Sequence, residues 1–207
     1  MNELIDLFFK GGFLMWPMLF QVILSLSIFL ERIIFLFYTS INKTKLLELI
    51  ELIQYQKLKI DEIWSHIERE FPKKTKTNET LILIKTILEK KQNSEPQIQI
   101  QGEELLQNLQ KRISVLVLNA QTAPLIGLLG TVIGMIQSFQ NISFEDGQIQ
   151  PERIAEGIWV AMITTAFGLI IAITSYVFYF ILDKIVEKRI SMMNTALSLR
   201  FSFYEQV

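Results

Sequence analysis

Three long stretches without a charged residue constrain this chain more than any other feature. They run from Gly11 to Leu30, from Ile113 to Phe144 and from Gly157 to Leu182. A helix needs about 20 predominantly apolar residues to cross a bilayer, and each stretch is long enough. The pattern predicts an all-α integral membrane protein with three transmembrane helices.

The composition supports this class and excludes several kinds of chemistry. Half of the residues are hydrophobic, and the mean hydropathy is +0.34. The net charge of −1 gives no basic excess for nucleic acid. There is no cysteine and His66 is the single histidine, so disulfides, thiol catalysis and a histidine-rich metal cluster are excluded. No nucleophile–base arrangement or phosphate loop stands out, so we expect no enzyme, no cofactor and no metal.

Lysine and arginine at the ends of the stretches predict the orientation, because cytoplasmic loops carry the excess of these residues. The basic flanking residues are Arg32, Lys43 and Lys45 after the first stretch, Lys111 and Arg112 before the second, and Lys184, Lys188 and Arg189 after the third. We therefore expect the N-terminus outside and the long middle segment and C-terminal tail in the cytoplasm. The first stretch is followed by Glu31–Arg32 instead of a cleavage site, which favours a retained anchor over a signal peptide.

The chain is thus divided into six segments. They are 1–38 with the first transmembrane helix, 39–112 as a cytoplasmic helical segment, 113–140 as the second transmembrane helix, 141–154 as a short periplasmic loop, 155–182 as the third transmembrane helix and 183–207 as a cytoplasmic C-terminal helix.

Apolar residues at helical spacing predict amphipathic helices in the cytoplasmic segment. They are Leu46, Leu49, Ile50 and Ile53 in one run, and Leu81, Ile84, Ile87 and Leu88 in another. From Glu103 the pattern predicts one unbroken helix into the second stretch, because no glycine or proline interrupts it before Pro124. The third stretch likewise continues past Leu182 in heptad-like register. We interpret this part as a small helical bundle that stabilises an assembly.

Small and hydroxylated residues follow one face of the second and third stretches. They are Ala123, Gly127, Gly130, Thr131, Gly134 and Ser138 in the second, and Gly157, Ala161, Thr164, Thr165, Gly168, Ala172 and Ser175 in the third. Steps of three or four residues place each set on one helical face. Such faces allow close packing of membrane helices, and that explains the glycines and alanines. The threonines leave a second interpretation open, in which they line a narrow, uncharged ion path.

The second and third stretches lack any acidic or basic residue. A proton relay needs an ionisable group within the membrane, so a partner would have to supply the carboxylate. Glu31 lies at the inner end of the first stretch beside Arg32. We interpret it as part of a boundary ion pair or as a snorkelling group.

The second and third stretches each contain a motif, and the two motifs together are highly specific for one family. "APLIGLLGTVIGMIQSF" followed by "IAEGIWVAMITTAFGLIIAI" resembles the MotA/TolQ/ExbB proton-channel family, and most closely its short ExbB/TolQ-type members. "GGFLMWPMLF" and "SIFLERIIFL" are similar to the first span of those members. The resemblance covers all three spans, whereas the segment from 39 to about 110 adds little to it.

This resemblance implies a multi-pass protein of the bacterial inner membrane that forms a homopentamer around a central pore. The pore would hold a single-span ExbD/TolR-like partner, in two copies, whose membrane aspartate carries the proton. A TonB-like protein is a further candidate partner. The implied function is an ion channel subunit of a motor that converts ion motive force into mechanical work on the cell envelope. Thr131 and Thr165 match the family's pore threonines, and Thr164 is an extra hydroxyl in the same path.

Two positions depart from the family pattern. Val160 stands where many members carry a glutamate, and Thr174 stands where many have a proline. The valine keeps a second function open, a non-conducting membrane scaffold for a multi-protein complex, and a divergent MotA-like stator is a third. The sequence leaves H⁺ and Na⁺ both open as the ion, because hydroxyl oxygens suit either.

Overall fold

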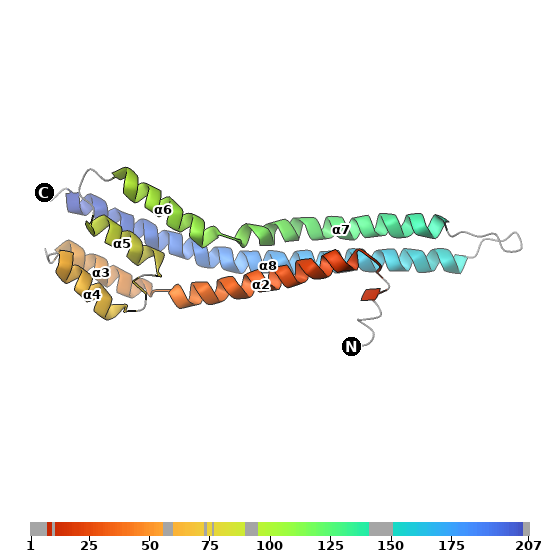
Figure 1. The fold of residues 1–207 in the computed structure, drawn as a ribbon, viewed down its shortest axis with the longest axis horizontal. Helices are drawn as coiled ribbons and strands as arrows, with labels where there is room; N and C mark the ends of the chain where they lie inside the picture. Colours follow the sequence, from red (N-terminus) through yellow and green to blue (C-terminus); the bar gives the residue numbers. More distant parts are fainter. Residues whose placement is uncertain are drawn as a thin grey trace, which may run out of the picture. The chain divides into compact units, whose positions relative to one another are not determined.

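The computed structural model describes residues 8–9, 11–55, 60–72, 74–75, 77–89, 95–140 and 151–204. The labelled helices in these residues are α2 (Met15–Thr39), α3 (Lys43–Tyr55), α4 (Ile60–Glu70), α5 (Glu79–Glu89), α6 (Glu95–Gln110), α7 (Ile113–Gln140) and α8 (Pro151–Tyr204) (Figure 1). Helices α2, α7 and α8 are long and apolar enough to cross a membrane by length and composition. The all-helical structure therefore fits the predicted integral membrane class. Most of the predicted 141–154 loop lies outside the described residues.

The predicted unbroken helix from Glu103 into the second stretch is wrong. Helix α6 ends at Gln110, and α7 begins at Ile113 after a turn. Arg112 in this turn has a φ of 67°, a left-handed conformation that costs a residue with a Cβ roughly 1–2 kcal/mol. No glycine marks the turn in the sequence, so the pattern gave no sign of it. Helix α8, by contrast, continues without a break past Leu182.

The helices divide between two compact units, which are described separately. The first unit comprises the described residues up to Glu31 together with Arg112–Ile181. Its apolar core contains Met15, Met18, Ala123, Ile171 and Ala172, contributed by α2, α7 and α8. Many large apolar side chains of the same helices point outward, and Phe20, Leu125 and Ile173 are each more than 60% exposed. An outward apolar surface of this kind suits lipid contact.

The second unit comprises Arg32–Lys111 together with the chain from Leu182 onward. Its core joins α3, α4, α5 and α8 through Ile41, Leu46, Leu49, Ile50, Ile53, Ile63, Ile67, Phe71, Leu81, Ile84, Leu88, Met192 and Ala196. The apolar runs predicted as amphipathic helices form α3 and α5, and their apolar faces are buried here. Helix α4 was not predicted, although its Ile63 and Ile67 belong to the same core.

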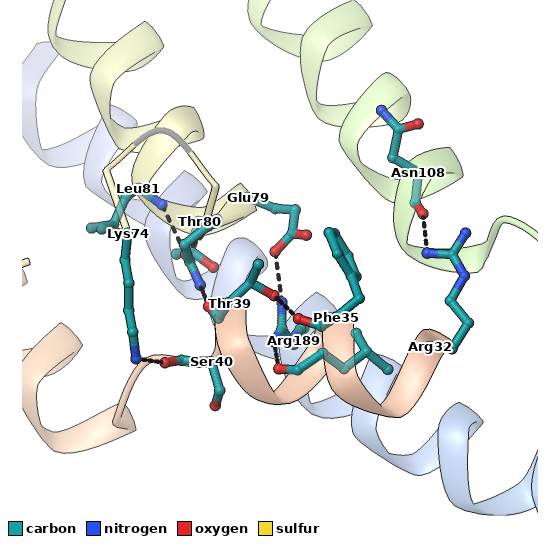
Figure 2. A network of polar contacts seen from close by, with 12 residues as sticks. Arg32, Phe35, Thr39, Ser40, Lys74, Glu79, Thr80, Leu81, Asn108 and Arg189 are labelled. Carbon is teal, nitrogen blue, oxygen red and sulfur yellow. Dashed lines mark hydrogen bonds and ion pairs between the residues drawn. The ribbon is translucent and has the colours of Figure 1, made fainter. Parts of the chain in front are cut away.

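The end of α2 is held by side chains of the second unit (Figure 2). The Arg189 guanidinium of α8 donates to the Leu36 carbonyl, to the Thr39 hydroxyl at 2.6 Å and to the Glu79 carboxylate at 2.9 Å. Arg189 and Glu79 are both nearly inaccessible to solvent. Burial lowers the pKa of Arg189, and the adjacent Glu79 opposes that shift. Arginine stays charged in proteins, so this is a buried ion pair.

Asn78 joins the start of α5 to the same helix end. Its side-chain oxygen accepts hydrogen bonds from the backbone N–H groups of Thr80 and Leu81, which makes it the N-cap of α5. Its side-chain nitrogen donates to the Thr39 carbonyl at 2.6 Å. The last carbonyls of a helix have no partner within the helix. Arg189 and Asn78 supply partners for two of these carbonyls at the end of α2.

Candidate functional site

Helices α7 and α8 meet along a line of small residues, here called the α7–α8 seam. The seam comprises Ala123, Gly127, Gly130, Gly134 and Ser138 of α7, and Gly157, Ala161, Thr164, Thr165, Gly168 and Ala172 of α8. Gly127 lies against Thr164 and Thr165, Gly134 against Ala161, and Gly157 against Ser138. Residue numbers rise along one helix as they fall along the other, so the two helices are antiparallel (Figure 1).

Two glycines lie against backbone atoms of the opposite helix. A Cβ added at Gly168 would lie 2.7 Å from the Ala123 carbonyl oxygen and 3.2 Å from the Gly127 Cα. A Cβ at Gly127 would lie 3.0 Å from both the Thr164 carbonyl oxygen and the Thr165 Cα. Backbone atoms cannot rotate away as side chains can. The two helices therefore pack backbone to backbone, which is how small residues drive association in lipid.

Thr164 and Thr165 both point toward the Gly127 carbonyl but differ in exposure. The Thr165 hydroxyl donates to this carbonyl at 3.0 Å, and Thr165 is half-buried. The Thr164 hydroxyl donates to Ala161 at 2.7 Å, with a second, longer contact of 3.4 Å to Gly127. Thr164 is only 2% exposed, and a Cβ at Gly130 would collide with its side chain. Thr164 thus fills the seam, whereas Thr165 lies at its edge.

Thr131 lies at the same level of the seam, one residue beyond Gly130. Its hydroxyl donates to the Leu128 carbonyl at 2.7 Å, and the residue is half-buried. Gly134 of α7 lies opposite Ala161 of α8. Continuing the antiparallel register from this pair places Thr131 opposite Thr164 and Thr165. No contact joins the two side chains Thr131 and Thr165 among the hydrogen bonds of the described residues. They lie near one another by register and are linked through Gly127.

Thr131 and Thr165 also lie on the side of the seam away from α2. Around α7, at roughly 100° per residue, Thr131 is on the face opposite Thr122, which binds Gln21 of α2. Around α8, Thr165 is turned well away from Phe178, whose ring stacks on Phe29 of α2 at 4.1 Å. Their edge of the seam is therefore not covered by the first span.

An uncharged polar cluster fastens α2 to the opposite side of the seam. The Asn119 side chain donates to the Ser25 hydroxyl at 2.9 Å and to the Gln21 carbonyl at 3.3 Å. Ser25 and Ser175 share a hydrogen bond of 2.8 Å, and Gln21 donates to the Thr122 hydroxyl at 2.9 Å. Sequence reasoning missed this cluster. The available sign was the pair of polar residues at Gln21 and Ser25, one helical turn apart within an uncharged span.

A shallow groove of about 330 Å³ lies on the uncovered side of the seam, nearer the start of α7. Its lining residues are Val117, Ala120, Gln121, Ala172, Ile173 and Tyr176. Pro124 follows within the same helix, and α7 continues through it without a break. Because proline has no N–H, the Ala120 carbonyl lacks its usual helical partner. The groove thus has apolar walls, with a freed backbone carbonyl in the same stretch of α7.

Charged residues lie in the second half of α2 and just before α7. Glu31 forms an ion pair with Arg112, and both side chains are about half exposed. The predicted boundary ion pair therefore exists, but its partner is Arg112 instead of the neighbouring Arg32. Arg32 is buried and donates to the Asn108 carbonyl at 3.3 Å (Figure 2). Across the described residues, no group of three His, Cys, Asp or Glu side chains could hold a metal ion.

Comparison with known proteins gives consistent matches. The family model described as MotA/TolQ/ExbB proton channel family matches residues 64–195. The putative biopolymer transport protein ExbB-like 1 of Synechocystis is 31% identical over 199 residues, which is 90% of this chain and 73% of that protein. The biopolymer transport protein ExbB of Aquifex aeolicus is 40% identical over 86 residues. The biopolymer transport protein exbB1 of Vibrio cholerae is 46% identical over 61 residues.

The coverage of these relatives differs. The matched segments span 27% of the Vibrio protein and 57% of the Aquifex protein, and they cover 30% and 41% of this chain. The match to the Synechocystis protein covers 90% of this chain.

Proposed function

Because the chain belongs to the MotA/TolQ/ExbB proton channel family, we propose that it is the ion channel subunit of an ExbB/TolQ-like motor. It is a multi-pass membrane protein of the ExbB type, and its proposed location is the bacterial inner membrane. In this proposal five copies surround a pore that holds two copies of an ExbD/TolR-like single-span partner. The complex converts ion motive force, most simply that of protons, into mechanical work on the cell envelope. A TonB-like protein is a further proposed partner.

The α7–α8 seam is the observation that carries this proposal. Close backbone packing at Gly127 and Gly168 brings two spans together, and hydroxyls at Thr131 and Thr165 lie along one edge of the contact. That edge is the one α2 leaves uncovered. Repeated around a ring of subunits, it supplies a narrow surface of hydroxyl oxygens without fixed charge. Uncharged oxygens that line a pore, such as backbone carbonyls in channels, can replace part of an ion's hydration shell.

The three predicted path residues take different roles in this proposal. Thr131 and Thr165 are half-buried at the uncovered edge, and they form the path. Thr164 is buried between the helices, so we assign it to positioning the seam. Ala123, Gly127, Gly130, Gly134, Gly157, Ala161, Gly168 and Ala172 form the packing surface that holds the path in shape. Val160 supplies no carboxylate, so the acid in the path belongs to the partner.

Basic residues at the ends of the spans support the proposed orientation, with the N-terminus outside. Lys111 precedes the second span and Lys184 follows the third span. Basic residues at the ends of spans are typical of the cytoplasmic side. Trp16 and Trp159 are 57% and 58% exposed near the starts of α2 and α8. Exposed tryptophans of this kind are typical of both membrane interfaces, which suits two helices that start at the same face.

Proton uptake into vesicles tests the proposal. The chain is reconstituted with and without its single-span partner, and uptake is driven by a membrane potential. We expect uptake only with the partner. In a Thr131→Val, Thr165→Val variant we expect uptake to decrease about tenfold or more, which corresponds to a barrier higher by about 1.4 kcal/mol. Thr174→Val is the matched control, because the Thr174 hydroxyl is exposed and bonds only within its own helix to Ile170.

Equal proton uptake in the double variant and the parent would show that Thr131 and Thr165 do not form the ion path. A stable complex with the partner that carries no ion under any applied potential would favour the scaffold function instead. In that case the seam would serve packing alone, and Thr131 and Thr165 would be replaceable by valine without effect on assembly.

A further inference from the structure

The turn between α4 and α5 is basic, and hydrogen bonds tie it to the end of α2. The sequence of this turn, 72–78, contains three lysines and no acidic residue. The Lys74 ammonium donates to the Ser40 carbonyl at 2.5 Å (Figure 2), and the Asn78 side chain donates to the Thr39 carbonyl at 2.6 Å. The Lys74 ammonium therefore lies beside the point where α2 ends, at Thr39.

Lys74 carries a positive charge that no carboxylate balances in the described part of the chain. Its ammonium has three N–H donors, and the Ser40 carbonyl accepts one of them. Lys45 of α3 differs, because it pairs with Glu70. Lys74 is also half-buried, and burial without a countercharge disfavours the charged form of a lysine. An anion beside Lys74 would offset this cost.

Lys43 provides a second unbalanced cation near the same helix end. It follows Ser40 by three residues, at the start of α3, and it is exposed. Over the residues that the structure describes, its side chain forms no ion pair. The two acids of α3, Glu48 and Glu51, lie roughly 8 and 12 Å farther along the helix. A local excess of positive charge therefore remains beside the end of α2.

Exposed aromatic rings lie in the last turn of α2, just before these lysines. Phe37 and Tyr38 are 81% and 82% exposed, and Ile34, one turn earlier, is 56% exposed. Tyrosine is enriched at membrane–water interfaces, where its ring lies at the level of the lipid headgroups. The apolar outer surface of α2 thus ends in an interfacial residue. Lys43 and Lys74 follow at the level where lipid phosphates are found.

We propose that Lys43 and Lys74 bind the headgroup of an anionic phospholipid at the end of α2, with Phe37 and Tyr38 beside its acyl chains. The inference goes beyond the proposed channel function and needs only that α2 crosses a bilayer. Anionic lipids attract basic residues that lie next to a membrane helix. A soluble phosphate could satisfy the same ammonium groups, but it would leave the exposed rings without a partner. The aromatic surface therefore favours a lipid as the source of the phosphate.

Native mass spectrometry of the full chain tests the site, because it resolves states that differ by one bound lipid. The protein is purified in detergent in its own oligomeric state, freed of lipid and titrated with phosphatidylglycerol. We expect the Kd of the first bound lipid to rise about fivefold in Lys43→Gln and also in Lys74→Gln, the effect of one basic residue beside an anionic lipid surface. Lys43→Arg and Lys74→Arg keep the charge and should keep the affinity.

Lys43→Gln is the decisive variant, because it removes no ion pair of the described structure and leaves the Ser40 contact intact. An unchanged Kd in this variant overturns the proposal. Lys45→Gln is the matched control, since it removes the same charge two residues farther on, from a lysine that pairs with Glu70. Its Kd should stay close to that of the parent. An equal rise in Lys45→Gln and Lys43→Gln would show that only net charge matters and would overturn the proposed site.

Competition separates a lipid from a soluble phosphate. Inorganic phosphate and glycerophosphoglycerol, the headgroup without acyl chains, are added to the lipid-bound protein at matched ionic strength. We expect neither to displace the lipid, and we expect Phe37→Ala, Tyr38→Ala to weaken lipid binding. Displacement by inorganic phosphate, or an equal affinity for phosphatidylcholine, overturns the proposal. These measurements do not depend on ion flux, so a failure of the proposed channel function would be recognised separately in the vesicle experiment.

Discussion

The Thr165 hydroxyl donates a hydrogen bond to the Gly127 carbonyl across the α7–α8 seam, with 3.0 Å between the two oxygens. This contact exists because neither Gly127 nor Gly168 carries a Cβ where the two backbones meet. Side-chain chemistry at the edge of the seam therefore depends on close packing at its centre. Substitutions that widen the seam should alter both the helix packing and the hydrogen bond of Thr165.

Gly168→Ala should destabilise the first unit. Its new Cβ would lie 2.7 Å from the Ala123 carbonyl oxygen, and relief requires a backbone shift, which typically costs roughly 1–3 kcal/mol. Gly102→Ala in α6 is the control, because the nearest atom there is a Leu83 methyl at 3.9 Å. Thermal unfolding in detergent should show a lower midpoint for Gly168→Ala only. A Gly168→Ala variant as stable as Gly102→Ala would contradict the close backbone contact.

The polar cluster between α2 and the other two spans should couple its members energetically. Ser25 and Ser175 share a hydrogen bond, and such bonds between membrane helices contribute about 0.6 kcal/mol on average. A double-mutant cycle of Ser25→Ala and Ser175→Ala, measured by unfolding in SDS, should give a favourable coupling energy of that order. Additive effects of the two substitutions would show that the pair contributes no net interaction.

Removing one partner of the buried ion pair should be severe. Arg189→Met leaves Glu79 charged and buried, and breaking such a pair costs roughly 3–5 kcal/mol. The double variant Arg189→Met, Glu79→Leu should recover much of the loss, because no charge remains buried. The exposed pair Lys184–Glu187 is the control, since exposed pairs contribute about 1 kcal/mol or less. Chemical unfolding followed by Trp64 fluorescence reports on this unit, and equal losses for Arg189→Met and Lys184→Met would contradict the buried pair.

The exposed pair between Lys45 and Glu70 predicts a pH dependence. The hydrogen bond from Lys45 lowers the pKa of Glu70 below its ordinary value of 4.5. A lowered folded-state pKa contributes stability that is fully present above that value and is lost as the pH falls through the folded pKa. The stability difference between the parent and Glu70→Gln should therefore be small but present at pH 7, and should vanish in acid. A difference that grows on acidification would contradict the pair.

Arg112 should tolerate glycine better than alanine. Both substitutions remove the ion pair with Glu31, so they differ mainly in the cost of the positive φ at this turn. Glycine adopts that conformation freely, whereas a residue with a Cβ does so at a cost of roughly 1–2 kcal/mol. Thermal unfolding should rank Arg112→Gly above Arg112→Ala. The reverse order would indicate that the turn is not left-handed in solution.

The spacing of apolar residues along the sequence predicted most of the helices. The uncharged stretches became α2, α7 and α8, and the apolar runs around Leu49 and Ile84 became buried helical faces. The steps of small residues were visible in the same way. These features are local, so each can be seen in a window of one or two dozen residues.

The missed features all depend on residues far apart in the sequence or on a single backbone angle. The Asn119 contacts with Gln21 and Ser25 join positions more than 90 residues apart. The turn at Arg112 has no glycine or proline to mark it. Likewise, the opposite exposures of Thr164 and Thr165 follow from the register of α7 on α8. Neighbouring positions in one sequence motif cannot reveal that register.

The capping of α2 has a consequence for biosynthesis. Leu36 is synthesised 153 residues before Arg189, the side chain that binds its carbonyl. The Thr39 carbonyl gains its partner only when Asn78, 39 residues later, has been synthesised. During translation the C-terminal end of α2 therefore emerges without these partners, and it is completed only after Arg189 of α8 has left the ribosome. A chain released before Arg189 would carry all three apolar spans into the membrane and still lack the residue that completes the end of the first.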